Sequence, residues 1–103
     1  KAVDRGAKVR VIMEKSPWND ALNDHNGYAK NWLAKAGVEV RFDDEDTVTH
    51  AKLVLCDDVA LVGTNNWTYS GLELDHEAGV RFEVPEAVAE LGDYFEKRWK
   101  EAQ

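Results

Sequence analysis

Residues of the kinds that take part in phosphate chemistry fall close together in the middle of this chain. They are His50, Lys52, Asp57, the run Gly63-Thr64-Asn65-Asn66, and Glu77, and the stretch around them is largely apolar. Burying a polar group costs about 2–7 kcal/mol unless it is hydrogen-bonded or takes part in function. The stretch therefore predicts an active site set into a β-sheet.

The first two of these residues predict attack on a phosphodiester by a histidine without a metal. Alternate residues of a strand point to the same face, so a strand over residues 50–56 would direct His50 and Lys52 to one side. An imidazole can act as a nucleophile or as an acid or base near neutral pH. A lysine supplies positive charge for phosphate oxygens.

The later residues would complete the site from the neighbouring strands. The Asn66 amide can donate to a phosphate oxygen without adding charge, and Thr64 can donate as well. Gly63 permits close approach of the backbone. Glu77 could accept a hydrogen bond from the other imidazole nitrogen of His50, as the carboxylate of a catalytic triad does.

Each of these residues, taken singly, has an ordinary structural explanation. A His-x-Lys pair is common by accident, Asn66 and Asp57 are typical turn residues, and Glu77 is a typical surface carboxylate. Only the ordered set favours phosphoryl chemistry over these alternatives.

Hydrophobic patterning predicts the elements that must position the set. Strands are expected over residues 8–14, 38–42, 50–56, 59–62 and 77–83, and helices over 28–36 and 86–102. Residues 23–27 have turn chemistry, Asp57-Asp58 forms a tight turn, and residues 63–75 form a structured loop. Trp32 and Trp99 lie on the apolar stripes of the two helices and are predicted to be core. The order of elements predicts an α/β fold with a mixed β-sheet flanked by helices.

Composition limits the class of protein. The 103 residues are enough for a single domain, and the net charge of −7 disfavours binding of nucleic acid or anionic lipid through bulk charge. No apolar run reaches the roughly 20 residues of a membrane helix, so we expect a soluble protein, with the cytoplasm favoured. The single cysteine, Cys56, is expected to be inert core. The chain does not begin with Met, so any targeting signal would lie in a segment before Lys1.

The ordered set resembles a known signature. His50-x-Lys52, then Asp57, then Gly63-Thr64-Asn65-Asn66, then Glu77 is similar to the HKD motif of the phospholipase D superfamily. The run from Arg5 to Val11 resembles that family's lead into a strand, and the run from Leu33 to Val38 resembles its helix-to-strand corner. The terminal helix resembles that of the small single-domain endonucleases of the superfamily. The likeness covers nearly the whole chain.

The resemblance implies a role for each matched residue. His50 would be the nucleophile that forms a phosphohistidine, Lys52 and Asn66 would hold the phosphate oxygens, and Glu77 would orient His50. Thr64 and Trp67 would contact the substrate, and Asp57 would be structural or would support a catalytic residue without touching the substrate. No metal or other cofactor is implied. Two HKD motifs meet in this family, so the second would come from another copy, as a homodimer, or from a second domain.

Two departures from the family pattern stand out. The segment from Asp57 to Gly63 is one residue shorter, which a tighter hairpin at Asp57-Asp58 would absorb. The family also has a further strand and a longer helix before the Arg5-Gly6 corner, so the chain is expected to be a fragment that lacks the N-terminal strand.

Three functions follow from this interpretation. The first is a homodimeric nuclease acting on nucleic acid, which the small size and the terminal helix favour. The second is a phospholipase or phosphatidyltransferase of the same superfamily, which is less favoured because no basic amphipathic segment suits a membrane surface. The third is a degenerate module that binds phosphodiesters without turnover.

Overall fold

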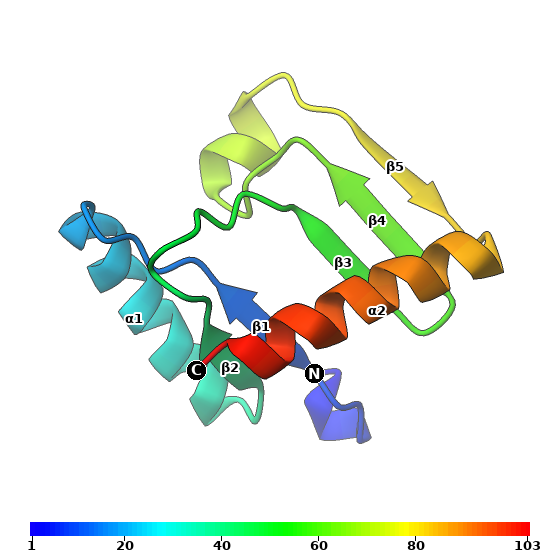
Figure 1. The fold of residues 1–103 in the computed structure, drawn as a ribbon, viewed down its shortest axis with the longest axis horizontal. Helices are drawn as coiled ribbons and strands as arrows, with labels where there is room; N and C mark the ends of the chain where they lie inside the picture. The colour runs from blue at the N-terminus through cyan, green and yellow to red at the C-terminus, as the bar shows by residue number, and fades with distance from the viewer. The chain divides into compact units, whose positions relative to one another are not determined.

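The computed structural model describes all 103 residues, which form two compact units. The first unit comprises Lys1–His50 and Lys97–Gln103, and the second comprises Ala51–Glu96. Figure 1 labels the helices and strands of both units.

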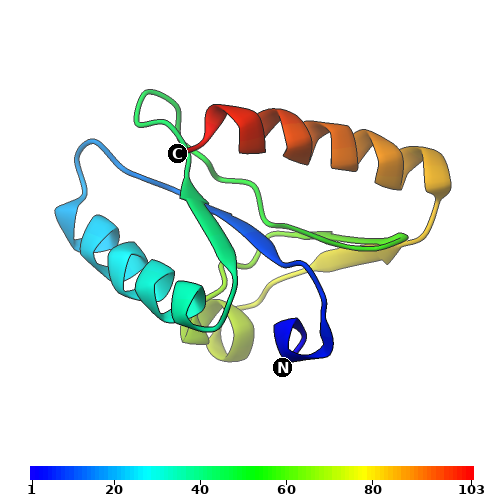
Figure 2. The same ribbon diagram turned by 90° about the horizontal axis from the view of Figure 1, so that it is seen from below.

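The first unit contains a parallel pair of strands. A short 3₁₀ helix, η1 (Val3–Arg5), precedes β1 (Arg10–Met13), α1 (Asp20–Lys35) and β2 (Glu39–Phe42). Strands β1 and β2 are parallel, with Arg10 opposite Glu39. Parallel neighbours need a long crossover, which α1 supplies, and Figure 2 shows this helix alongside β2.

Helix α1 has a defined start and a defined end. The Asn19 side chain accepts a hydrogen bond from the Leu22 N–H at 3.0 Å, which satisfies one of the free donors of the first turn. The helix ends at Lys35, and Gly37 follows with φ of +85°, a left-handed conformation that favours glycine. The helix end predicted at residue 36 is confirmed to within one residue.

The turn predicted at residues 23–27 is wrong, because these residues are helical. Asn23 accepts from the Ser16 N–H at 2.9 Å and donates to the Ser16 carbonyl at 2.7 Å. Asn26 donates to the carbonyl of Glu14 at 2.8 Å. The two asparagines therefore satisfy the backbone of the preceding loop from within the helix instead of forming a turn of their own.

The predicted apolar stripe of α1 is also largely wrong. Trp32 is 72% exposed and Tyr28 is 77% exposed, whereas Leu33 is half-buried. The helix begins at Asp20, earlier than predicted, and the preceding loop contacts the face that carries Asn23 and Asn26. The exposed aromatic side chains lie on the other side of the helix.

Residues 97–103 join the first unit through Trp99, which is 7% exposed as predicted for a core residue. The guanidinium groups of Arg41 and Arg10 lie 4.3 Å and 5.3 Å from the centre of its indole ring. Arg41 also donates to the Trp99 carbonyl at 2.6 Å. Beyond it, Gln103 and Phe42 exchange both of their backbone hydrogen bonds, at 2.6 and 2.8 Å.

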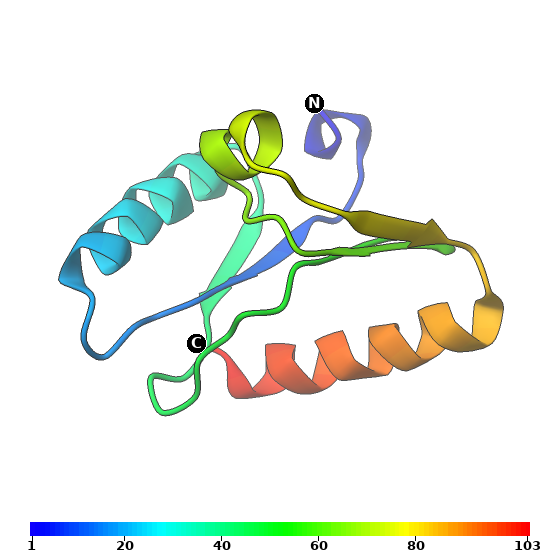
Figure 3. The ribbon, with the colours of Figure 1, turned by 90° about the horizontal axis from the view of Figure 1, so that it is seen from above.

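The second unit is an antiparallel sheet in the order β3-β4-β5. Its strands are β3 (Leu53–Cys56), β4 (Val59–Gly63) and β5 (Gly79–Phe82). A π-helical turn, η2 (Ser70–Leu74), connects β4 to β5, and Figure 3 shows it at the end of the sheet away from the β3–β4 turn. Ala60, on the central strand, is fully buried.

The final helix, α2 (Pro85–Glu101), begins with proline, which suits the first helical turn because its missing N–H needs no partner there. The predicted α/β class is confirmed, with helices and with both parallel and antiparallel pairing, and the strands are divided between two sheets. No helix combines the length and the apolar character that a bilayer crossing requires.

Candidate active site

The β3–β4 hairpin has the tight turn that the sequence predicts. Cys56 pairs with Val59, so the turn consists of Asp57 and Asp58 alone. Asp57 has φ of +52°, a left-handed conformation that aspartate tolerates better than most residues. The predicted two-residue turn is confirmed. Cys56 itself is exposed, so its prediction as core is wrong.

Asp57 lies at the opposite end of β3 from Lys52. The strand between them covers Leu53–Cys56, and each residue advances the chain by about 3.3 Å, so the two residues are roughly 16 Å apart. One phosphate group cannot contact both. The role of Asp57 stays a prediction.

Lys52 lies beside two glycines at the other end of the sheet. The Gly63 N–H donates to the Lys52 carbonyl at 3.2 Å, and Gly63 is opposite Gly79 on β5. A Cβ atom on Gly63 would lie 3.1 Å from the Ala78 carbonyl oxygen and 3.2 Å from the Gly79 Cα. The glycine therefore allows the close backbone approach that the sequence predicts, and it leaves the positions across from Lys52 without side chains.

Thr64 links the end of β4 to Glu77, just before β5. Its hydroxyl donates to Glu77 Oε2 and accepts from the Ala78 N–H at 3.1 Å. The Thr64 N–H also donates to the Ala78 carbonyl at 3.0 Å. The hydroxyl also lies 3.3 Å from the Ala78 carbonyl oxygen, and its contact with the Glu77 carboxylate joins that group to the end of β4. Donation by Thr64 to a substrate stays a prediction.

Asn66 follows this link and lies against the π-helical turn. A Cβ atom on Gly71 would lie 2.4 Å from the Asn66 carbonyl oxygen and 3.1 Å from its nitrogen. The next residue, Trp67, is 56% exposed. Sequence reasoning did not identify Gly71, because its only signal is a glycine in a loop that already contains several turn residues.

His50 is exposed and is the last residue of the first unit, while Lys52 belongs to the second. Strand β3 begins at Leu53, so the predicted strand over residues 50–56 is wrong for its first three residues. Its partner, β4, ends at Gly63, whose N–H donates to the Lys52 carbonyl, so β4 offers no residue to pair with positions 50 and 51. Glu77 likewise precedes β5, which begins two residues later than the predicted strand over residues 77–83. The roles of His50 and Glu77 stay predictions.

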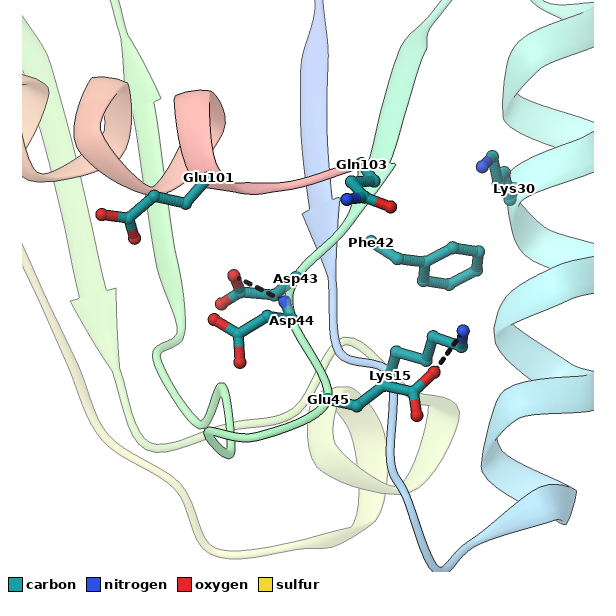
Figure 4. Close-up of a pocket in the computed structure, with 8 residues that line it drawn as sticks. All are labelled: Lys15, Lys30, Phe42, Asp43, Asp44, Glu45, Glu101 and Gln103. Carbon is teal, nitrogen blue, oxygen red and sulfur yellow. Dashed lines mark hydrogen bonds and ion pairs between the residues drawn. The ribbon is translucent and has the colours of Figure 1, made fainter.

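A separate pocket of about 470 Å³ lies in the first unit. Figure 4 shows its lining residues, which are Lys15, Lys30, Phe42, Asp43, Asp44, Glu45, Glu101 and Gln103. Lys15 forms an ion pair with Glu45, and the Lys30 ammonium lies 4.7 Å from the centre of the Phe42 ring. None of the predicted site residues lines it. No group of three or more His, Cys, Asp or Glu side chains is arranged to hold a metal ion.

Sequence comparison connects this geometry to known proteins. Residues 1–99 match the family described as cardiolipin synthase, PLD-like domain. The mitochondrial cardiolipin hydrolase of Mus musculus is 34% identical over 98 residues, which are 94% of this chain and 42% of that protein. The chain therefore spans less than half the length of this curated relative.

Structural comparison agrees in fold. The phospholipase D family member Nuc from Salmonella typhimurium superposes with a TM-score of 0.82 at 22% identity, over 99% of this chain and 66% of that one. NucT from Helicobacter pylori superposes with a TM-score of 0.75 at 18% identity, over 98% of this chain and 67% of that one. The arrangement of elements and the family match over residues 1–99 lead to one conclusion: the chain belongs to the phospholipase D superfamily.

Proposed function

We propose that this chain is a metal-independent phosphodiesterase that acts on nucleic acid, with His50 as its nucleophile. The observation that carries the proposal is the end of the β3-β4-β5 sheet. There Lys52 lies beside two glycines, and the Thr64 hydroxyl fixes the Glu77 carboxylate. Lys52 supplies a cation, Asn66 supplies an amide and Glu77 supplies an oriented carboxylate. Together these groups suit a site that binds a phosphate and orients a histidine to attack it.

In the proposed reaction, a neutral His50 nitrogen attacks phosphorus and the bond to the leaving oxygen breaks. That oxygen takes a proton from a second histidine. Water then attacks phosphorus, the bond between His50 and phosphorus breaks, and the second histidine accepts the water's proton. Lys52 and Asn66 hold the non-bridging oxygens, and Glu77 accepts from the other nitrogen of His50. The products are a phosphate monoester and an alcohol.

The proposed reaction needs a second HKD motif, because this chain carries one. A second copy in a homodimer would supply the other histidine, and so would a second HKD domain. A neutral nucleophile and a protonated acid together give a bell-shaped dependence of kcat on pH. A profile that is flat through the neutral range would contradict the paired-histidine mechanism.

Cleavage of single-stranded DNA in excess EDTA tests the proposal. We expect cleavage by the unmodified protein and by His25→Ala, whose histidine lies on α1, and none by His50→Ala. Cleavage that persists in His50→Ala would refute the histidine mechanism. A phosphate label trapped on His50 would exclude a module that only binds.

A lipid phosphodiester is the second candidate substrate. The matched family description and the name of the mouse relative both mention cardiolipin, which favours it. Vesicles that contain cardiolipin provide the test, with His50→Ala as the control. Turnover of the lipid without cleavage of DNA would replace the nuclease proposal while leaving the histidine chemistry intact.

A further inference from the structure

We infer that Gly71 is a positioning residue for Asn66, and that this position must lack a side chain for Asn66 to reach the phosphate. The inference rests on the proposed function for the role of Asn66. The geometric part concerns the second unit alone, because both residues lie within it.

The contact between Gly71 and Asn66 is made by main-chain atoms. A Cβ atom on Gly71 would lie 2.4 Å from the Asn66 carbonyl oxygen, 3.1 Å from its nitrogen and 3.2 Å from its carbonyl carbon. Ordinary contact begins near 3.4 Å, so the added atom requires a movement of about 1 Å. No flexible side chain is present to absorb this movement. Gly71 has no positive φ, so it is needed for space and not for its backbone conformation.

The turn around Gly71 is held by its own hydrogen bonds. The Gly71 N–H donates to the Thr68 hydroxyl at 3.1 Å, and the Leu72 N–H donates to the Thr68 carbonyl at 3.0 Å. The Asp75 N–H donates to the Ser70 carbonyl at 2.8 Å, and the Ser70 hydroxyl donates to Asp75 at 3.0 Å. These bonds oppose movement of the turn, so the strain of an added methyl group falls on Asn66.

The burial of Gly71 also supports its role as a positioning residue for Asn66. Gly71 is the one buried residue of η2, whereas Tyr69, Leu72 and Leu74 are 73%, 53% and 62% exposed. The apolar side chains of this segment therefore do not pack it against the sheet. The buried residue of η2, Gly71, lies against the main chain of Asn66.

Kinetics of Gly71→Ala test the inference, with Gly92→Ala as the matched control. Gly92 lies in α2, and a Cβ atom there meets nothing within 4 Å. A displacement of about 1 Å in a catalytic group can lower a rate about 100-fold. We expect a fall in kcat of that order in Gly71→Ala, a smaller change in KM, and an unchanged kcat in Gly92→Ala. An unchanged kcat in Gly71→Ala would overturn the inference.

A double-mutant cycle separates positioning from general loss of structure. In an Asn66→Ala background, Gly71→Ala should change kcat by less than about threefold, because its effect acts through the missing amide. A further 100-fold loss there would show that Gly71 acts independently of Asn66, which would overturn the inference.

Nuclear magnetic resonance makes the test independent of turnover. The backbone and side-chain amide signals of Asn66 should move in Gly71→Ala and stay in place in Gly92→Ala. Movement without any diester cleavage by the unmodified protein would uphold the positioning and refute the proposed function. Unmoved Asn66 signals would refute the positioning whatever the activity.

Discussion

Replacing Thr64 with valine isolates the hydroxyl that fixes Glu77. Valine keeps the branched shape of threonine but removes the donor to the Glu77 carboxylate and the acceptor for the Ala78 N–H. A hydrogen bond to a charged group contributes about 1.5–3 kcal/mol. Thr64 and Glu77 are both exposed, so water replaces much of the lost interaction. The expected loss of folding stability is therefore about 1 kcal/mol, which lowers Tm by about 4–8 °C in a domain of this size.

The effect on turnover should exceed the effect on stability. Without the hydroxyl, Glu77 loses the side-chain donor that fixes its carboxylate beside β4. If Glu77 orients His50 as proposed, we expect kcat to fall about tenfold, equivalent to about 1.4 kcal/mol of barrier. The assay is single-turnover cleavage of a chromogenic phosphodiester, read together with thermal melting.

Thr64→Ser is the matched control, because serine keeps the hydroxyl and loses only the methyl group. We expect Thr64→Ser to retain a rate within about threefold of the unmodified protein. Equal rates in Thr64→Val and Thr64→Ser would refute the reasoning. So would a full additional tenfold loss when Thr64→Val is placed in a Glu77→Ala background, because the hydroxyl would then act without the carboxylate.

Three further predictions concern charge, backbone conformation and helix capping. Lys52→Ala should lower kcat more than it raises KM, and a rise in KM alone would show that Lys52 binds ground state and transition state equally. Gly37→Ala should destabilise the fold by about 1–2 kcal/mol or more, since φ is +85° and the new Cβ would lie 2.8 Å from a Val3 methyl carbon, while Gly92→Ala should stabilise it by about 1 kcal/mol. Urea unfolding measures both, and shifts of the same sign would contradict the structure. Asn19→Ala should cost about 1 kcal/mol in the same assay through loss of the α1 cap, and an unchanged midpoint would exclude that role.

Local sequence rules predicted well where the helices begin or end and where the hairpin turns. Asp57-Asp58 forms the expected two-residue hairpin turn, and α1 ends and α2 begins within one residue of the predicted bounds, at Lys35 before Gly37 and at Pro85. Each of these depends on the conformational preference of one or two residues, which the sequence states directly. The α/β class followed from the order of apolar patterns, and it is confirmed.

Where these local rules failed, tertiary contacts determined the structure. Asn23 and Asn26 have turn chemistry, but hydrogen bonds to Ser16 and Glu14 let them lie inside α1. Exposed Trp32 shows that an apolar period does not identify the face that another element will cover. Local preference is weak compared with the free energy of satisfying a buried backbone group.

The sequence by itself determined which chemical groups are present and in what order. The types and spacing of His50, Lys52, Asn66 and Glu77 were enough to indicate the superfamily, because spacing along the chain is a property of the sequence alone. The tertiary structure decided how those groups are held. The Thr64 hydroxyl reaches Glu77 across 13 positions, and the missing side chain of Gly71 makes room for Asn66. Hydrogen-bond partners and excluded volume depend on where the chain returns in space, and no local preference specifies that return.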